Sequence, residues 1–84
     1  MTNPITLAAR VKRNNPYYAL TCATLTRHHM QGRFDAQAAT RLIMRNCRET
    51  AQGIYDARQV QQAAKILLQD WRATYIAGAS IKAE

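Results

Sequence analysis

The sequence predicts an all-α fold, a compact single domain of four helices. Three observations lead to this class: apolar residues recur at helical spacing, no run alternates with the two-residue period of a strand, and helix-starting and helix-ending residues divide the chain into four segments. A length of 84 residues allows one domain. We expect helices over residues 4–13, 16–30, 36–52 and 57–77, in a domain that spans 1–78 and precedes a loose C-terminal tail, 79–84.

The first two helices are predicted to begin at two Asn-Pro pairs. The side chains of Asn3 and Asn15 can accept hydrogen bonds from the free N–H groups of a first helical turn. Pro4 and Pro16 suit the first helical position, because the N–H that proline lacks would have no partner there. Both pairs therefore predict a helix start.

The last two helices are predicted to begin after a turn that occurs twice, at residues 31–35 and 52–56. In each copy a glycine can take the left-handed conformation that ends one helix, and an aspartate can cap the next. In the second copy, Gln59 stands three residues after Asp56, which completes a capping box.

The third and fourth predicted helices each carry an apolar arc and a basic strip beside it. The strip of the third helix is Arg41, Arg45 and Arg48, and that of the fourth is Arg58, Lys65 and Arg72. The apolar arcs are the predicted core: Ala36, Ala39, Thr40, Ile43, Met44, Cys47, Thr50 and Ala51 in the third helix, and Val60, Ala63, Ala64, Leu67, Leu68, Trp71 and Tyr75 in the fourth.

The second predicted helix is mostly uncharged, since no charged residue occurs from Tyr17 to Thr26. Its apolar residues point in several directions, which is typical of a helix surrounded by others. We therefore expect it at the centre of the domain, with its threonines bonding back to the preceding turn.

The chain is strongly basic, with twelve Lys and Arg against five Asp and Glu and a net charge of +7. This balance excludes an acidic DNA mimic and favours an anionic partner. Most of the basic residues are arginine, whose planar fork binds phosphate or carboxylate at two points. The clusters either converge on one surface or form four separate solvated faces: Arg10, Lys12 and Arg13; Arg27 and Arg33, with the histidines at 28 and 29; Arg41, Arg45 and Arg48; Arg58, Lys65 and Arg72.

The residues do not predict an enzyme, a metal site or a bound cofactor. The five acidic residues offer no pair suited to acid–base chemistry, because two are explained as helix caps and one ends the chain. His28 and His29 are adjacent, which points them about 100° apart on a helix and is the wrong geometry for one metal ion. Cys22 and Cys47 lie inside helical patterns and are expected to be buried and reduced.

These features favour a small, non-catalytic binding protein that contacts nucleic acid through its arginine-rich helix faces. For base stacking, the candidate aromatics are Tyr17, Tyr55 and Tyr75. The alternative is a protein–protein interaction module, such as a phage- or plasmid-type inhibitor or adaptor, docking on an acidic or nucleic-acid-binding surface of a larger complex.

Two further expectations concern location and self-association. No stretch approaches the roughly 18 apolar residues of a membrane span, so we expect a cytoplasmic protein without a membrane partner. Leu42 and Ile66 lie off the main apolar arcs. Either the bundle wraps far enough to cover them, or they form a homodimer surface together with Ala73.

Overall fold

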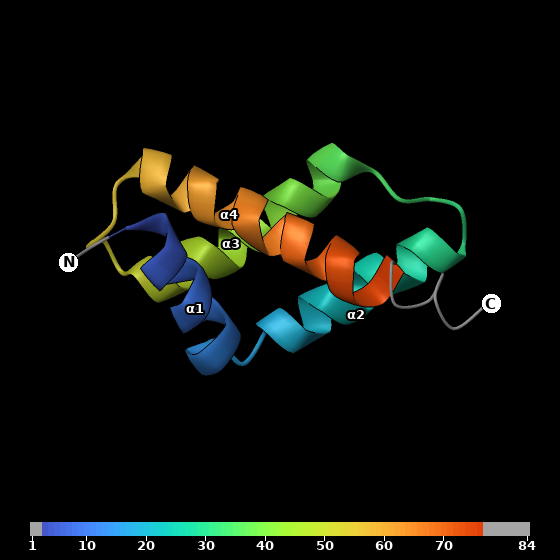
Figure 1. Cartoon of the computed structure of the whole chain (residues 1–84), viewed down its shortest axis with the longest axis horizontal. Coiled ribbons are helices and arrows are strands. Elements are labelled where there is room, and N and C mark those ends of the chain that lie inside the picture. The colour runs from blue at the N-terminus through green and yellow to red at the C-terminus, as the bar shows by residue number, and fades with distance from the viewer. Residues whose placement is uncertain (1–2, 77–84) are drawn as a thin grey trace.

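The computed structural model describes residues 3–76 and confirms an all-α single domain (Figure 1). It contains α1 (Pro4–Asn14), α2 (Tyr18–Met30), α3 (Ala36–Ala51), α4 (Ala57–Trp71) and a short π-helical segment, η1 (Arg72–Ile76). The molecule is elongated, with extents of 42 × 21 × 21 Å. The predicted tail, 79–84, and the last predicted residues of the domain lie outside the described residues.

The predicted helix starts are confirmed where an aspartate or asparagine caps a first turn. Asn3 Oδ1 accepts a hydrogen bond from the Thr6 N–H at 2.8 Å, at the start of α1. Asp56 forms the predicted capping box with Gln59: its carboxylate accepts from the Gln59 N–H at 2.8 Å, and the Gln59 side chain accepts from the Asp56 N–H at 3.1 Å. Gly53 has φ of +80°, as expected of the turn that precedes this cap.

Asp56→Ala is expected to destabilise the protein by about 1 kcal/mol, because the first turn of α4 loses the acceptor for one of its free N–H groups. Asp56→Asn is the matched control, since asparagine caps about as well as aspartate. Urea denaturation followed by circular dichroism measures the difference. Equal free energies of unfolding for the alanine variant and the wild type would contradict the role of the cap.

Asn15 was predicted to cap the second helix, and this prediction is wrong. The helix begins at Tyr18 without a side-chain cap, and Asn15 Oδ1 accepts from the Tyr17 N–H at 2.9 Å in the connecting turn. The Asn15 amide instead donates to the Asn46 carbonyl at 3.0 Å and to the Thr50 hydroxyl at 3.1 Å. The Asn15 side chain thus bonds to α3 and does not cap α2. These bonds tie the α1–α2 connection to α3.

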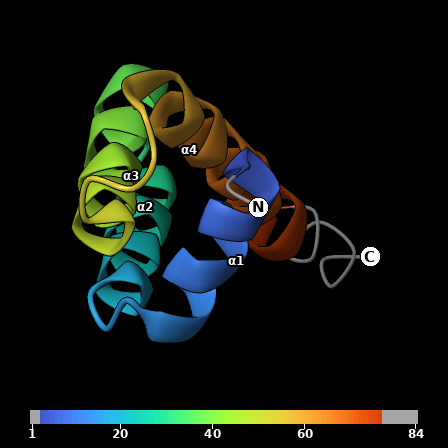
Figure 2. The same ribbon diagram turned by 90° about the vertical axis from the view of Figure 1, so that its left-hand side faces the viewer.

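The core is formed where α1, α3 and α4 pack together (Figure 2). Leu7 of α1, Ile43 of α3 and Leu67 of α4 are completely buried there. Most of the buried residues of α3 and α4 come from the two apolar arcs predicted from helical spacing. Burial of these arcs is the main source of stability, at roughly 25 cal/mol per Å² of apolar surface.

The second helix does not lie at the centre of the domain, contrary to our expectation. Only Cys22 and Leu25 of α2 are buried, and Leu20 is 66% exposed. The helix carries no charge before Arg27, and the residues that it exposes include Ala19, Leu20 and Ala23. The hydroxyls of Thr21 and Thr24, for example, bond back to the preceding turn as predicted. Because α1, α3 and α4 pack mainly against one another, α2 lies at the edge of the bundle.

Both cysteines are buried and unpaired, as predicted. Burial raises the pKa of the Cys47 thiol from 9.0 to about 11, because the charged thiolate is poorly solvated in the core. Burial also raises the pKa of Cys22. Both thiols therefore stay protonated and unreactive at neutral pH.

Unfolding is expected to become easier between pH 9 and pH 11 because of Cys47. Below pH 9 the thiol is protonated in both the folded and unfolded states, and above it the unfolded chain loses the proton first, which favours unfolding. Urea denaturation at several pH values measures this loss. Cys47→Ala is the comparison: if its stability falls as steeply with pH as that of the wild type, Cys47 is not the cause.

Candidate functional site

The predicted binding residues all lie on the solvent-exposed surface of the described chain. The side chains follow the outer faces of the helices, as expected when the apolar arcs turn inward. They are Arg10, Lys12, Arg13, Arg27, Arg33, Arg41, Arg45, Arg48, Arg58, Lys65 and Arg72.

Almost all of these cations lack an anionic partner within residues 3–76. In that range one ion pair is present, between Lys12 on α1 and Asp70 on α4. Arg72 instead lies over the ring of Phe34, with the guanidinium carbon 5.3 Å from the ring centre. The remaining predicted binding residues keep their charge available for a ligand.

The structure separates the basic strips of α3 and α4. Arg41 and Arg48 lie on the side of α3 opposite the buried Ile43, and Lys65 lies opposite the buried Leu67 of α4. Because α3 and α4 pack against each other through their buried sides, each strip faces outward from its own helix. The two strips do not meet across the contact between these helices.

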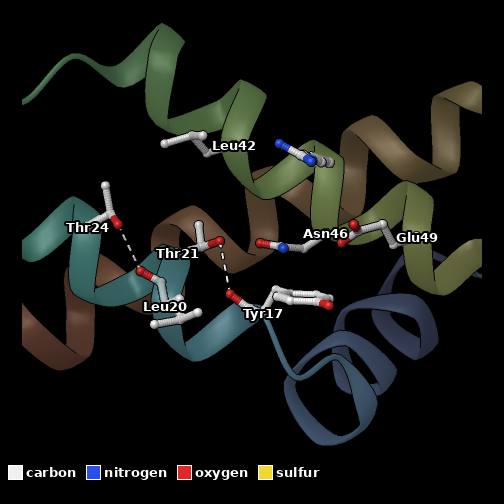
Figure 3. Close-up of a pocket in the computed structure, with 8 residues that line it drawn as sticks. Tyr17, Leu20, Thr21, Thr24, Leu42, Asn46 and Glu49 are labelled. Carbon is white, nitrogen blue, oxygen red and sulfur yellow. Dashed lines mark hydrogen bonds between the residues drawn. The ribbon is translucent and has the colours of Figure 1, made fainter.

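Arg45 of the α3 strip and Arg10 of α1 line adjoining hollows that share Tyr17. A groove between α2 and α3, with a volume of about 430 Å³, is lined in part by Tyr17, Glu49 and Arg45 (Figure 3). An adjoining hollow of about 500 Å³ shares Tyr17 and Glu49 and is lined on α1 by Arg10. A cation of α1 and a cation of α3 therefore line hollows that share one exposed tyrosine, an arrangement that spacing along single helices did not predict.

Of the three tyrosines considered for base stacking, Tyr17 is the most exposed, at 58%. Tyr55 is buried in the core and cannot stack on a ligand. Tyr75 is half exposed and lies against Trp71, with ring centres 6.4 Å apart. The structure thus favours Tyr17 as the aromatic contact.

Asn46 is a groove residue that sequence reasoning missed. It is 3% exposed, and its Oδ1 has no hydrogen-bond partner in the described structure. A buried polar atom without a partner typically costs about 1–3 kcal/mol. The sequence signal for Asn46 was its position: a polar residue on the apolar arc of its helix, between Ile43 and Cys47.

The histidines lie in the last turn of α2, as predicted. His29 contacts the aromatic cluster edge-on, with ring centres 6.4 Å from Phe34 and 6.3 Å from Trp71. In the part of the chain that the structure describes, no three His, Cys, Asp or Glu side chains are grouped to hold a metal ion.

The residues considered for a homodimer surface do not form an exposed apolar face. Leu42 and Ile66 are half-buried and pack against the core, so the bundle covers them in part. Ala73 is exposed on η1. A dimer through these three residues stays a prediction.

Comparison with protein-family models, curated proteins and solved structures found no match. Among residues 3–76, no helix has both the length and the apolar character needed to cross a membrane.

Proposed function

We propose that the protein is a small, non-catalytic nucleic-acid-binding protein, held mainly by contacts between its arginines and phosphates. The observation that carries this proposal is the set of exposed basic side chains that have no carboxylate partner in the described chain. Neutralising phosphates with such side chains releases bound counterions, and this release drives non-specific binding to nucleic acid.

The distribution of charge supports a nucleic acid over an acidic protein as the partner. The basic strips of α3 and α4 face outward from different helices, and Arg10 lies beside a third face. A phosphate backbone carries charge along its whole length, and a flexible single strand can follow cations from one face to the next. The unpaired thiols are in keeping with a reducing compartment such as the cytoplasm.

Fluorescence anisotropy with labelled duplex DNA, duplex RNA and single-stranded DNA tests the proposal. We expect binding in about 50 mM salt, and a linear fall of log K with log salt whose slope is about −0.9 per phosphate contacted on duplex DNA. Absence of salt-dependent binding to all three nucleic acids would refute the proposal.

That negative result would favour the alternative, docking on an acidic surface of a larger protein complex. Met30 and Ile54 are large apolar side chains that are mostly exposed, and each lies in or beside a turn near basic residues. Apolar side chains ringed by charge are typical of protein interfaces. Retention of one specific protein from a nuclease-treated lysate, lost in Met30→Ser or Ile54→Ser, would support this alternative.

A further inference from the structure

The groove between α2 and α3 contains an unsatisfied hydrogen-bond acceptor. The Asn46 side chain extends from α3 toward Thr21 of α2 (Figure 3), yet its Oδ1 receives no hydrogen bond in the described structure. Its backbone carbonyl, by contrast, accepts from Asn15 at 3.0 Å and from Thr50 at 3.0 Å. The residue is thus anchored through its backbone, while its side-chain oxygen is buried in the wall of the groove without a partner.

The hydroxyl and carboxylate groups on the walls of the groove are also acceptors. The Thr21 hydroxyl donates its proton to the Tyr17 carbonyl at 3.2 Å, and the Thr24 hydroxyl donates to the Leu20 carbonyl at 2.9 Å. These hydroxyls therefore offer lone pairs to a ligand, as does the Glu49 carboxylate. A ligand that pairs with these acceptors presents N–H or O–H donors to them.

The remaining groove residues indicate a flat ligand with an anion attached. Tyr17 is 58% exposed and Leu20 is 66% exposed, so a ring and an aliphatic side chain are both available for stacking. Arg45 lines the same groove and supplies a cation, for which no carboxylate partner is present in residues 3–76. The volume of about 430 Å³ falls within the roughly 300–1,000 Å³ of small-molecule sites.

From these features we infer that the groove binds one unpaired base of a single-stranded nucleic acid and prefers guanine to thymine. The inference rests on the proposed nucleic-acid-binding function. The base stacks on Tyr17, its N–H groups donate to Asn46 Oδ1 and neighbouring acceptors, and Arg45 contacts the adjacent phosphate. Guanine presents an imino and an amino donor side by side with one carbonyl oxygen beyond them. Thymine instead has one N–H between two carbonyl oxygens, and both oxygens would face the acceptors of the groove.

The test compares two labelled single strands of about 12 nucleotides, one of thymines only and one with a single central guanine. Both strands carry the same number of phosphates, so contacts to the backbone contribute equally. We expect the guanine strand to bind at least about fivefold more tightly, which corresponds to the lower end of the 1–3 kcal/mol typical of a well-placed base contact.

Two variants locate the preference in the groove. Asn46→Leu removes the unpartnered acceptor and is expected to abolish the guanine preference, while the melting temperature stays unchanged or rises because a buried polar atom without a partner is gone. Tyr17→Ala, at an exposed position, is expected to weaken binding of both strands, whereas Tyr17→Phe keeps the ring and should bind as the wild type does. Tyr75→Ala is the control tyrosine outside the groove.

The outcomes separate this inference from the function on which it rests. Salt-dependent duplex binding together with equal affinity for the two strands would overturn the groove assignment and leave the proposed function standing. A guanine preference that persists in Asn46→Leu and Tyr17→Ala would also overturn it. A dimer seen by sedimentation without nucleic acid and lost in Tyr17→Ala would assign the groove to a second copy of the chain, and failure to bind any nucleic acid would refute the function itself.

Discussion

Trp71→Ala is expected to destabilise the protein by about 3–5 kcal/mol, the range typical of removing a large buried aromatic side chain. Trp71 is 2% exposed and stacks on Phe34, with ring centres 5.2 Å apart. Its indole N–H donates to the Thr26 hydroxyl at 3.1 Å, which links α4 to α2 at the edge of the bundle. At roughly 0.05–0.15 kcal/mol per residue, a domain of this length has a total stability of about 4–13 kcal/mol, so the loss is a large share.

Urea denaturation followed by circular dichroism measures this loss without relying on the tryptophan signal. Trp71→Phe keeps a ring against Phe34 and is expected to lose less. Thr26→Val leaves the indole N–H without its acceptor and is expected to cost about 1–3 kcal/mol. A free energy of unfolding for Trp71→Ala within 1 kcal/mol of the wild type, at about the precision of such comparisons, would show that the aromatic cluster is not part of the stable core.

The second large effect concerns binding: Arg41→Gln combined with Arg48→Gln is expected to weaken duplex binding and to make it less dependent on salt. Both side chains are exposed on the outer face of α3 and have no carboxylate partner in residues 3–76. If each contacts one phosphate, the slope of log K against log salt becomes shallower by about 2. Neither side chain belongs to the core, so the free energy of unfolding should change little.

Arg58→Gln combined with Lys65→Gln is the matched control, because it removes the same charge from the outer face of α4. If the slope of log K against log salt becomes shallower in only one of the two double variants, the helix face that carries those two residues contacts the duplex. Equal effects indicate that the duplex contacts both faces or that net charge dominates. Unchanged slopes in both double variants would contradict a role for the strips of α3 and α4.

Helix boundaries were largely predictable from the sequence because capping is local chemistry. The capping box of Asp56 involves residues three positions apart, so its geometry depends on few atoms outside the turn. Asn15 shows the limit of this reasoning. Its amide donates to α3 residues more than thirty positions away, and no local rule predicts those partners.

The position of α2 was not predictable, because absence of charge was read as apolar character. Thr21 and Thr24 are uncharged, yet their hydroxyls are satisfied within the helix and tolerate water. Whether such a helix lies inside or outside depends on which surfaces its neighbours leave uncovered. In this fold α1, α3 and α4 bury their apolar arcs against one another, and α2 takes the remaining edge.

The basic residues of the candidate site were found in the sequence, since arginines outside an apolar arc face solvent. The arrangement of these residues in space could not be found from the sequence, and neither could the groove between α2 and α3. Tyr17, Asn46 and Arg10 come from different helices or connections, and packing alone brings them to adjoining hollows.

Sequence alone therefore established the all-α class, most of the helix starts and the exposed cations, because each depends on residues within a few turns of one another. Packing between helices settled the edge position of α2, the separation of the basic strips and the unpartnered Asn46 oxygen. These features depend on contacts between distant segments, which helical periodicity within a single helix does not encode.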